Sequence, residues 1–220
     1  MMTAPANETE AFRILTEGVR LLGLSVGHKQ IARMVTYLEM LIRWQERVNL
    51  TSIRGIHDLA TLHFLDSLTV FKVITTGEHR RVLDIGTGGG FPGVVMKIVD
   101  ESMNLTLLDR DPKKIVFLKN ICRELRLEGV DFLNFTLEVL LDDPPRDPFD
   151  LVISRALLSD PKQLDSLQPL IAQRGSLIRM AGPSLRKRDI VLDNFRESAT
   201  WEGELPGTGT SRRVIRYARI

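Results

Sequence analysis

A short apolar run that leads directly into a glycine-rich turn constrains this chain of 220 residues more than any other feature. Residues 82–85 are mostly branched and apolar, which is typical of a buried parallel strand. A turn with glycine at positions 86, 88, 89 and 90 follows, and the apolar residues 94–99 indicate the start of a helix. Glycine allows a close approach of the backbone to a ligand and permits positive φ angles. Because open α/β sheets bind ligands where their strands end, the segment predicts a nucleotide-type cofactor site.

The spacing of the glycines favours one class of cofactor. From Gly86 the chain reads G-T-G-G-G-F-P-G, which fits a dinucleotide fingerprint only loosely. Asp84 completes the pattern D-x-G-x-G-x-G, with glycines at Gly86, Gly88 and Gly90, and this resembles the first motif of S-adenosylmethionine-dependent methyltransferases. Pro92 has no N–H to offer a pyrophosphate. We therefore favour a methyltransferase turn, with a dinucleotide enzyme and a glycine-rich loop without a ligand as the alternatives.

A second acidic residue ends the next predicted strand. Asp109 follows Gly86 by roughly the 20 residues expected of a carboxylate that accepts hydrogen bonds from ribose hydroxyls. The alternative is a solvated aspartate at a turn, because Asp111 and Pro112 would cap and begin a helix. Both nucleotide interpretations predict the ribose contact, so Asp109 does not distinguish between them.

The order of predicted elements after residue 80 indicates the fold class. Strands are expected at residues 81–85, 104–109, 130–135, 151–154 and 176–180, and helices at residues 91–99, 112–127, 161–171 and 183–195. Residues 200–205 and 208–220 predict a closing antiparallel pair. Alternating strands and helices form a parallel sheet with helices on both faces. Together with the turn, they predict an α/β, Rossmann-like class I methyltransferase fold with a mostly parallel seven-stranded sheet.

The first part of the chain has a helical pattern instead. Apolar residues recur at helical spacing within residues 8–76, most strongly over residues 31–42, and a third helix is expected over residues 57–73. Their apolar faces must pack on each other or on the sheet. We expect an N-terminal helical extension, residues 1–76, and an S-adenosylmethionine-binding methyltransferase domain, residues 77–220.

Composition limits the classes of protein that the chain can belong to. A hydrophobic content of 43% is ordinary for a globular protein, and no apolar run approaches the ~18 residues of a membrane span. The single cysteine excludes an internal disulfide framework, and residues 1–10 lack the apolar core of a secretory signal, so we expect a cytoplasmic protein. Four histidines and one cysteine show no metal-ligand spacing.

The net charge of +2 is too small to indicate nucleic-acid binding by itself, and it does not argue against such binding. Local clusters matter more, and each either touches RNA phosphate or forms a solvated face. One cluster is Arg186-Lys187-Arg188, and the other contains Arg212, Arg213, Arg216 and Arg219.

Five ordered markers make the chain resemble the glucose-inhibited division protein B family from about residue 38 to its end. These are Trp44 with Asn49-Leu50-Thr51, then His63-Phe64-Leu65-Asp66-Ser67, then the turn of residues 86–93, then Leu107-Leu108-Asp109 with Lys113-Lys114 and Phe117-Leu118, and finally Phe149-Asp150 with Ile153-Ser154-Arg155-Ala156. The resemblance implies an enzyme that methylates guanine N7 in 16S ribosomal RNA, with S-adenosylmethionine as the methyl donor. It implies RNA or the small ribosomal subunit as partner, and we expect a monomer without a metal or a membrane anchor.

The resemblance also implies roles for individual residues. The cofactor contacts expected by position are Gly86 and Phe91 in the turn, Leu137 and Glu138 beside the adenine, and Arg155 between cofactor and substrate. We expect Asn49, His63, Lys113 and Lys114 to contact the substrate. Arg155 has an alternative as a surface arginine paired with Asp150 or Asp160. For His63 and Asp66 together two alternatives stay open: a buried polar pair that docks the helices onto the sheet, or two residues that line the mouth of the pocket.

Two positions depart from the family pattern. Leu62 stands where the family usually has an arginine, and Ala181-Gly182 stands where it often has Lys-Gly, with Arg179 two residues earlier. Both changes remove a positive charge that could meet RNA.

The expected chemistry needs no general base, because guanine N7 has a lone pair and no proton. The contribution of the enzyme is then mostly alignment. Arginine typically binds the N7 and O6 edge of guanine, and a bond to N7 would block the reaction, so O6 or phosphate is the expected contact of Arg155. Two alternatives stay open: a methyltransferase that acts on a small molecule or a protein, and an RNA-binding assembly factor that keeps the fold.

Overall fold

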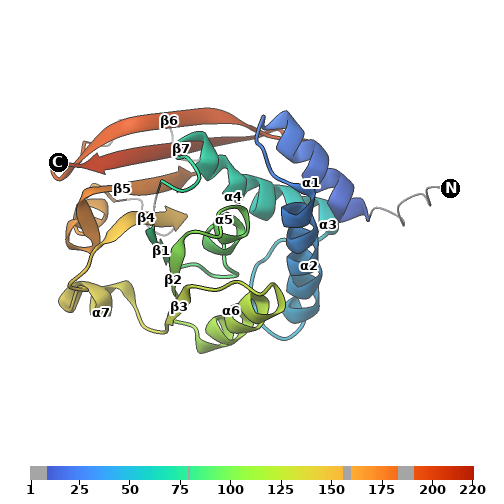
Figure 1. Cartoon of the computed structure of the whole chain (residues 1–220), viewed down its shortest axis with the longest axis horizontal. Helices are drawn as coiled ribbons and strands as arrows, with labels where there is room; N and C mark the ends of the chain where they lie inside the picture. Colours follow the sequence, from blue (N-terminus) through green and yellow to red (C-terminus); the bar gives the residue numbers. More distant parts are fainter. Residues whose placement is uncertain (1–8, 79, 156–159, 183–190) are drawn as a thin grey trace.

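The computed structural model describes residues 9–78, 80–155, 160–182 and 191–220, and within them one twisted sheet of seven strands forms the centre (Figure 1). The strand order is β3-β2-β1-β4-β5-β7-β6. The first five strands of this order are parallel, whereas β7 runs antiparallel to both β5 and β6. The strands are β1 (Arg81–Ile85), β2 (Asn104–Leu108), β3 (Val130–Leu133), β4 (Phe149–Arg155), β5 (Ile171–Ala181), β6 (Phe195–Leu205) and β7 (Thr210–Arg219). The predicted α/β fold class is confirmed, including the closing antiparallel pair.

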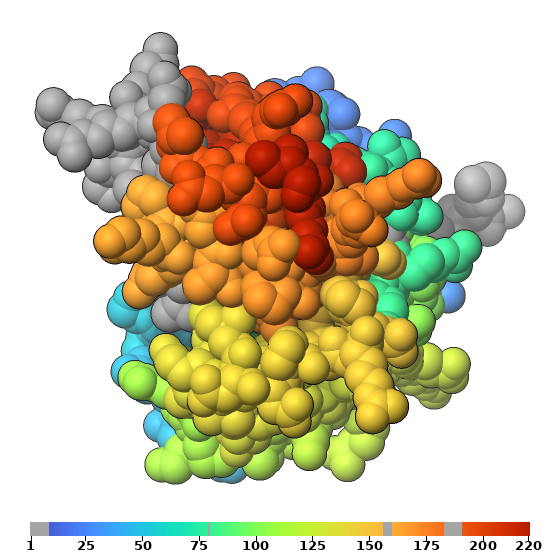
Figure 2. All heavy atoms as spheres, turned by 90° about the vertical axis from the view of Figure 1, so that its left-hand side faces the viewer, coloured from blue at the N-terminus to red at the C-terminus, as the bar shows by residue number. Residues whose placement is uncertain are grey.

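Both faces of the sheet are covered, as the apolar strand sequences require. Side chains alternate along β4, so Ile153 lies in the core on one face and Val152 in the core on the other. Helices α5 (Gly93–Val99) and α6 (Pro112–Glu124) cover the first face. The second face is covered by α7 (Leu137–Asp142), α8 (Pro161–Asp165) and the 3₁₀ turn η3 (Gln168–Leu170), which dominate the view in Figure 2 together with the late strands.

Two N-terminal helices add an outer layer to the first face. Figure 1 shows α1 (Glu10–Leu21) and α2 (His28–Gln45) beyond α4 and α5, on the side away from the sheet. Thr9 caps α1 by accepting a hydrogen bond from the Phe12 amide. Leu15 and Leu38 are buried in the same core cluster as Val94, Leu107 and Ile153, so the helical segment and the sheet share one core.

The third predicted helix is present as a continuous run of helical turns, but it is not a regular α-helix throughout. Residues 56–72 divide into α3 (Ile56–Leu59), a π-helix η1 (Ala60–Leu65), α4 (Asp66–Leu68) and a 3₁₀ turn η2 (Thr69–Lys72). The hydroxyls of Thr61, Ser67 and Thr69 each donate to a carbonyl three or four residues earlier, at His57, His63 and Asp66. Such bonds compete with regular helix geometry, so apolar spacing alone does not indicate the changes of helix type.

Two other helix predictions also need correction. Residues 161–171 do not form one helix, because Pro169 lies in η3, where it cannot donate a helical hydrogen bond, and Ile171 already begins β5. The helix predicted over residues 183–195 lies mostly outside the described residues, and its last residue, Phe195, begins β6. Helix α7 was not predicted, and α6 ends three residues earlier than expected, where Arg126 adopts a positive φ of 51°. No helix in the described part of the chain has the length and apolar character that a membrane span requires.

Candidate active site

The glycine turn lies at the carboxyl end of β1 and is organised by the carboxylate below it. Asp84 is fully buried, and its Oδ2 accepts hydrogen bonds from the Thr87 hydroxyl at 2.7 Å and the Gly93 amide at 2.9 Å. Burial raises the pKa of Asp84 to about 6. Gly86 and Gly90 have φ angles of 67° and 94°, which glycine adopts without strain. Asp84 therefore fixes the turn from inside.

Three stacked rings hold the turn from the side of the N-terminal helices. The ring of Phe91 lies 4.5 Å from that of His63 and 5.3 Å from that of Tyr37, and both pairs are nearly parallel. The Tyr37 hydroxyl also donates a hydrogen bond to the carbonyl of Gly89. The turn is thus packed between α2 and η1.

A cavity of about 410 Å³ opens in front of the turn, at the carboxyl ends of β1 and β2. Asp109 lines it and uses both carboxylate oxygens: Oδ2 accepts from the Gly88 amide and Oδ1 from the Asp111 amide, each at 2.9 Å. The Nζ of Lys114 lies 3.9 Å from the same carboxylate. The remaining wall is partly apolar and partly polar, with Ile85, Gly86, Leu108, Arg110, Phe135, Thr136, Leu137, Glu138 and Gln163. The volume suits a nucleoside-sized ligand.

A second cavity, of about 260 Å³, lies where β4, β5 and β7 meet the segment of residues 53–66. Two arginines and one carboxylate give it its charge. Its lining residues are Ile53, Leu62, His63, Asp66, Arg155, Met180, Ala181, Gly182 and Arg212. Ile85 of the first cavity and Ser154, the neighbour of Arg155, are partners in the β1–β4 register, so both cavities lie at the carboxyl ends of the parallel strands.

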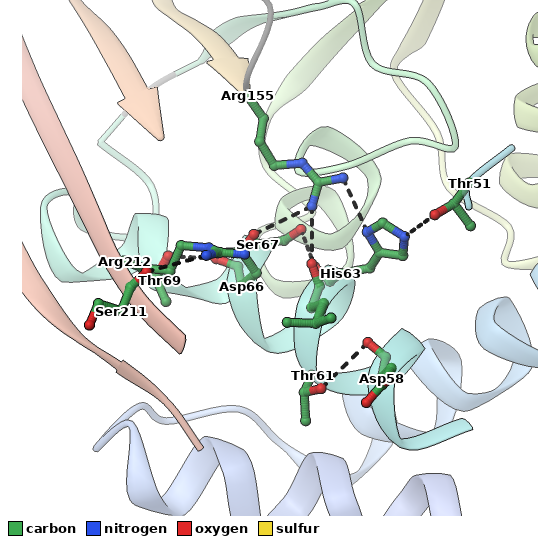
Figure 3. A network of polar contacts seen from close by, with 11 residues as sticks. Thr51, Asp58, Thr61, His63, Asp66, Ser67, Thr69, Arg155, Ser211 and Arg212 are labelled. Atoms are coloured by element: carbon green, nitrogen blue, oxygen red, sulfur yellow. Dashed lines mark hydrogen bonds and ion pairs between the residues drawn. The ribbon is translucent and has the colours of Figure 1, made fainter. Parts of the chain in front are cut away.

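Arg155, the last residue of β4, is held by a network that Figure 3 shows. Its Nη1 donates to the Leu62 carbonyl at 3.3 Å and lies 3.5 Å from Asp66 Oδ2. Its Nη2 lies 3.1 Å from His63 Nδ1, and its Cζ lies 5.5 Å from the centre of the Phe91 ring. Arg155 does not pair with Asp150, whose Oδ2 accepts from the amides of residues 80 and 81.

Asp66 joins a second arginine to this network. Its Oδ1 accepts a hydrogen bond from Arg212 Nε at 2.9 Å (Figure 3). The Asp66 side chain is 4% exposed, and burial raises its pKa against the opposing effect of the two guanidinium groups. His63 is also buried, and desolvation with the nearby charge of Arg155 lowers its pKa to about 3.

Comparison with known sequences decides which family this chain belongs to. The family model described as "GidB: rRNA small subunit methyltransferase G" matches residues 30–200. This chain belongs to that family. The resemblance expected from the sequence markers is confirmed, and with it the assignment as a methyltransferase of class I fold.

Curated members of this methyltransferase G family match over most of the chain. "Ribosomal RNA small subunit methyltransferase G" of Syntrophus aciditrophicus is 33% identical over 97% of this chain and 92% of its own. The protein of the same name from Geotalea uraniireducens is 34% identical over 97% of this chain and 99% of its own.

Solved structures with lower identity share the fold. TrmN from Thermus thermophilus has a TM-score of 0.55 at 17% identity, covering 80% of this chain and 53% of its own. The N-methyltransferase NodS from Bradyrhizobium japonicum has a TM-score of 0.52 at 15% identity, covering 70% of this chain and 93% of its own.

In this member of the methyltransferase G family, the expected site residues fall into three groups. Gly86, Asp109, Lys114, Leu137 and Glu138 line the larger cavity, and His63 and Arg155 line the smaller one. Asp84, Gly88, Gly90 and Phe91 lie under or within the turn and do not line either cavity. Asn49 and Lys113 are exposed and also lie outside both linings.

Three residues of the network were not selected from the sequence. Thr51 was quoted as part of a marker, but Asn49 was selected beside it, and it is Thr51 whose hydroxyl lies 2.8 Å from His63 Nε2. Asp66 is expected only together with His63, either as a buried polar pair or at the mouth of the pocket; it lines the smaller cavity, and both residues contact Arg155. Arg212 was noted only as part of a charge cluster. The position of Asp66 three residues after His63 was the available signal.

The structure separates the four arginines of the C-terminal cluster. Arg213 pairs with Glu202, Arg216 pairs with Glu78, and Arg219 donates to the Ile171 carbonyl. Arg212 differs from them because it lines the smaller cavity. The other basic cluster, residues 186–188, lies outside the described residues, as does Ala156.

Both departures from the family pattern occur at the smaller cavity. Leu62 and Ala181 both line it, and neither side chain brings a positive charge to it. Arg179 does not supply one there, because its neighbours Ile178 and Met180 face the first core and Arg179 faces the second.

Proposed function

We propose that this protein transfers a methyl group from S-adenosylmethionine to N7 of a guanine in 16S ribosomal RNA. The observation that carries the proposal is that the cavity after the glycine turn and the cavity lined by Arg155 both lie at the carboxyl ends of the neighbouring parallel strands β1 and β4. The larger cavity follows the glycine turn and would hold the cofactor, and the smaller one carries two arginines and would receive the guanine. Family membership supports ribosomal RNA as the substrate.

The residues of the larger cavity fit S-adenosylmethionine. Leu108, Phe135 and Leu137 offer apolar surface for an adenine, and Asp109 stands where a ribose would lie. We propose that Gly86 allows close approach of the methionyl part, that Glu138 lies beside the adenine, and that Asp84, Gly88, Gly90 and Phe91 shape the turn. The bound cofactor would supply an electrophilic methyl group on a positively charged sulfur.

The acceptor chemistry needs no general base. The N7 lone pair forms the new bond to the methyl carbon while the carbon–sulfur bond breaks and its electron pair stays on sulfur. No proton moves, and His63 has no need to act as a base. We propose that Arg155 holds guanine O6 or an adjacent phosphate and so aligns N7 with the methyl group.

Other contacts with RNA would come from polar and charged residues. We propose that Asn49, Lys113, Lys114 and Arg212 contribute them, and that the three cations among them bind phosphate, which makes affinity fall steeply with salt. We also propose that the protein acts in the cytoplasm as a monomer, with residues 1–76 as the helical extension and residues 77–220 as the methyltransferase domain.

The test is a methylation assay on the small ribosomal subunit and on its free RNA. The protein is incubated with labelled S-adenosylmethionine, and the RNA is digested to nucleosides. We expect labelled 7-methylguanosine from small-subunit RNA. Gly86→Asp should abolish it, because a carboxylate would enter the cofactor cavity, and Arg155→Ala should lower the rate by about 100-fold or more.

The same assay distinguishes the alternatives. Label in a different nucleoside would contradict the N7 assignment. Cofactor binding without any RNA methylation would favour a small molecule or protein as the acceptor. If the protein neither binds the cofactor nor methylates RNA, but still binds RNA, an assembly factor that keeps the fold would be favoured.

A further inference from the structure

Arg155 receives its contacts from one short segment of another part of the chain. Leu62, His63 and Asp66 all approach its guanidinium group, from the Leu62 carbonyl, the imidazole Nδ1 and the carboxylate Oδ2. The ring of Phe91 lies on the side of the cofactor turn. The position of the Arg155 charge is thus set by the segment of residues 62–66.

The contacts of His63 determine which of its nitrogens carries the proton. A guanidinium group only donates hydrogen bonds, so Nδ1 of His63 must accept from Arg155. The proton is then on Nε2, which donates to the Thr51 hydroxyl at 2.8 Å. The ring is fixed further by its stacking on Phe91. His63 is therefore a neutral acceptor whose two nitrogens are both occupied, and it offers no charge to a substrate.

Asp66 divides its carboxylate between arginines from two strands. Oδ2 faces Arg155 of β4, and Oδ1 accepts from Arg212 of β7, which is 146 residues further along the chain. Two guanidinium groups and one carboxylate leave a single net positive charge at the smaller cavity, where the structure places both arginines in the lining. One buried carboxylate thus orients two cations without neutralising the site.

We infer that Asp66 and His63 are positioning residues, which act on methyl transfer through the guanidinium group of Arg155. Asp66 holds Arg155 and Arg212 at the smaller cavity, and His63, held in turn by Thr51, keeps Arg155 above the Phe91 ring. The inference rests on the proposed function for its kinetic consequence and on geometry alone for the protonation state of His63.

The first experiment needs no activity and no variant. Long-range ¹⁵N–¹H NMR spectra of the histidine rings in the full chain report the tautomer of His63. We expect the Nε2–H tautomer, with no change between pH 8 and pH 5. An Nδ1–H tautomer, or titration near the ordinary histidine pKa of about 6.5, would overturn the network, whatever the acceptor of the methyl group is.

The second experiment asks whether Asp66 acts through Arg155. Asp66→Asn should lower kcat by about 10-fold or more in the wild-type background, and by less than about 2-fold when Arg155→Ala is already present, because residues that act as a unit are not additive. Equal losses in both backgrounds would show that Asp66 acts independently of Arg155 and would overturn the inference.

Matched controls and a conservative variant keep this test interpretable. Asp58 and His57 lie in α3, just before this segment, and their exposed side chains contact each other rather than Arg155, so Asp58→Asn and His57→Gln should leave kcat unchanged. His63→Gln can still accept from Arg155 and should retain far more activity than His63→Ala. Equal losses for these two would contradict the role of His63. If the wild-type protein leaves ribosomal RNA unmethylated, the proposed function fails, while the NMR result still decides the network.

Discussion

His63 illustrates how a single residue can tie the site to the stability of the protein. Its pKa is lowered to about 3 by burial and by Arg155, whereas in the unfolded chain it would be near 6.5. Between these values the unfolded state binds the additional proton. The neutral ring thus contributes stability that is fully present above pH 6.5 and is lost as the pH falls towards 3.

This difference in pKa gives a prediction for stability. The free energy of unfolding of the wild-type protein should fall, relative to His63→Gln, by about 1 kcal/mol for each pH unit between 6.5 and 4. Urea unfolding of both proteins at several pH values measures the difference, in which all other titrating groups cancel. Parallel pH profiles would contradict a buried neutral His63.

Two glycines of the turn make a matched pair. Gly90 and Gly88 both have positive φ, but a Cβ at Gly90 would collide with the Tyr37 hydroxyl, Leu118 and Val94, whereas at Gly88 the nearest neighbour is 3.9 Å away. Gly90→Ala should therefore cost about 3 kcal/mol, from strain and overpacking together, and Gly88→Ala about 1 kcal/mol from strain alone. Thermal unfolding of both variants checks this, and equal losses would be inconsistent with crowding at Gly90.

At the scale of elements, the contact between α2 and the glycine turn is the least expected feature. Tyr37 is fully buried, packs edge-on against Phe64 and stacks on Phe91, and its hydroxyl bonds the buried Gly89 carbonyl. An N-terminal helix thus holds the turn that would bind the cofactor.

Removing only this hydroxyl tests the contact. Tyr37→Phe leaves the Gly89 carbonyl without its partner and should lower stability by about 1–3 kcal/mol and weaken S-adenosylmethionine binding. Tyr217→Phe is the control, because Tyr217 is buried on the other face of the sheet. Calorimetric titration with S-adenosylmethionine measures the cofactor affinity of both variants. Unchanged affinity in Tyr37→Phe would show that α2 does not support the turn.

Elements with a strong local pattern were predictable, and those shaped by side-chain bonds were not. The strand and the turn of residues 82–90 could both be predicted, because branched apolar residues and glycines determine the local backbone conformation. The segment of residues 56–72 has helical apolar spacing and is helical throughout, yet hydroxyls such as that of Thr61 bond backbone carbonyls and the helix type changes three times. Pro169 is a local signal against one helix over residues 161–171, because proline has no N–H for a helical hydrogen bond.

At the scale of the whole molecule, one core joins the helical extension to the sheet. Leu15 and Leu38 from the extension and Leu107 and Ile153 from the sheet belong to one buried cluster. The same long-range packing explains why the site was only partly predictable: Arg155 and the cofactor turn carry local motifs, whereas Asp66 and Arg212 meet only in the folded chain.

The shared core predicts how the protein unfolds. The full chain should melt in one cooperative transition, and a fragment of residues 77–220 should not fold stably alone. Each exposed large apolar side chain costs about 1.5–3 kcal/mol, and several of them exceed the stability of a typical domain. Circular dichroism melts of both proteins check this. A cooperative fragment melting near the full chain would show that the extension is dispensable for folding.

We propose that Arg155 stands between a cofactor cavity and a guanine cavity. A crystal structure of the protein with S-adenosylhomocysteine, the product of the cofactor, measures this most directly. We predict that the ligand lies in the cavity lined by Gly86, Asp109 and Leu137, with its sulfur directed towards Arg155 and the smaller cavity. A ligand bound elsewhere, or bound there with its sulfur turned away from Arg155, would contradict this position of Arg155.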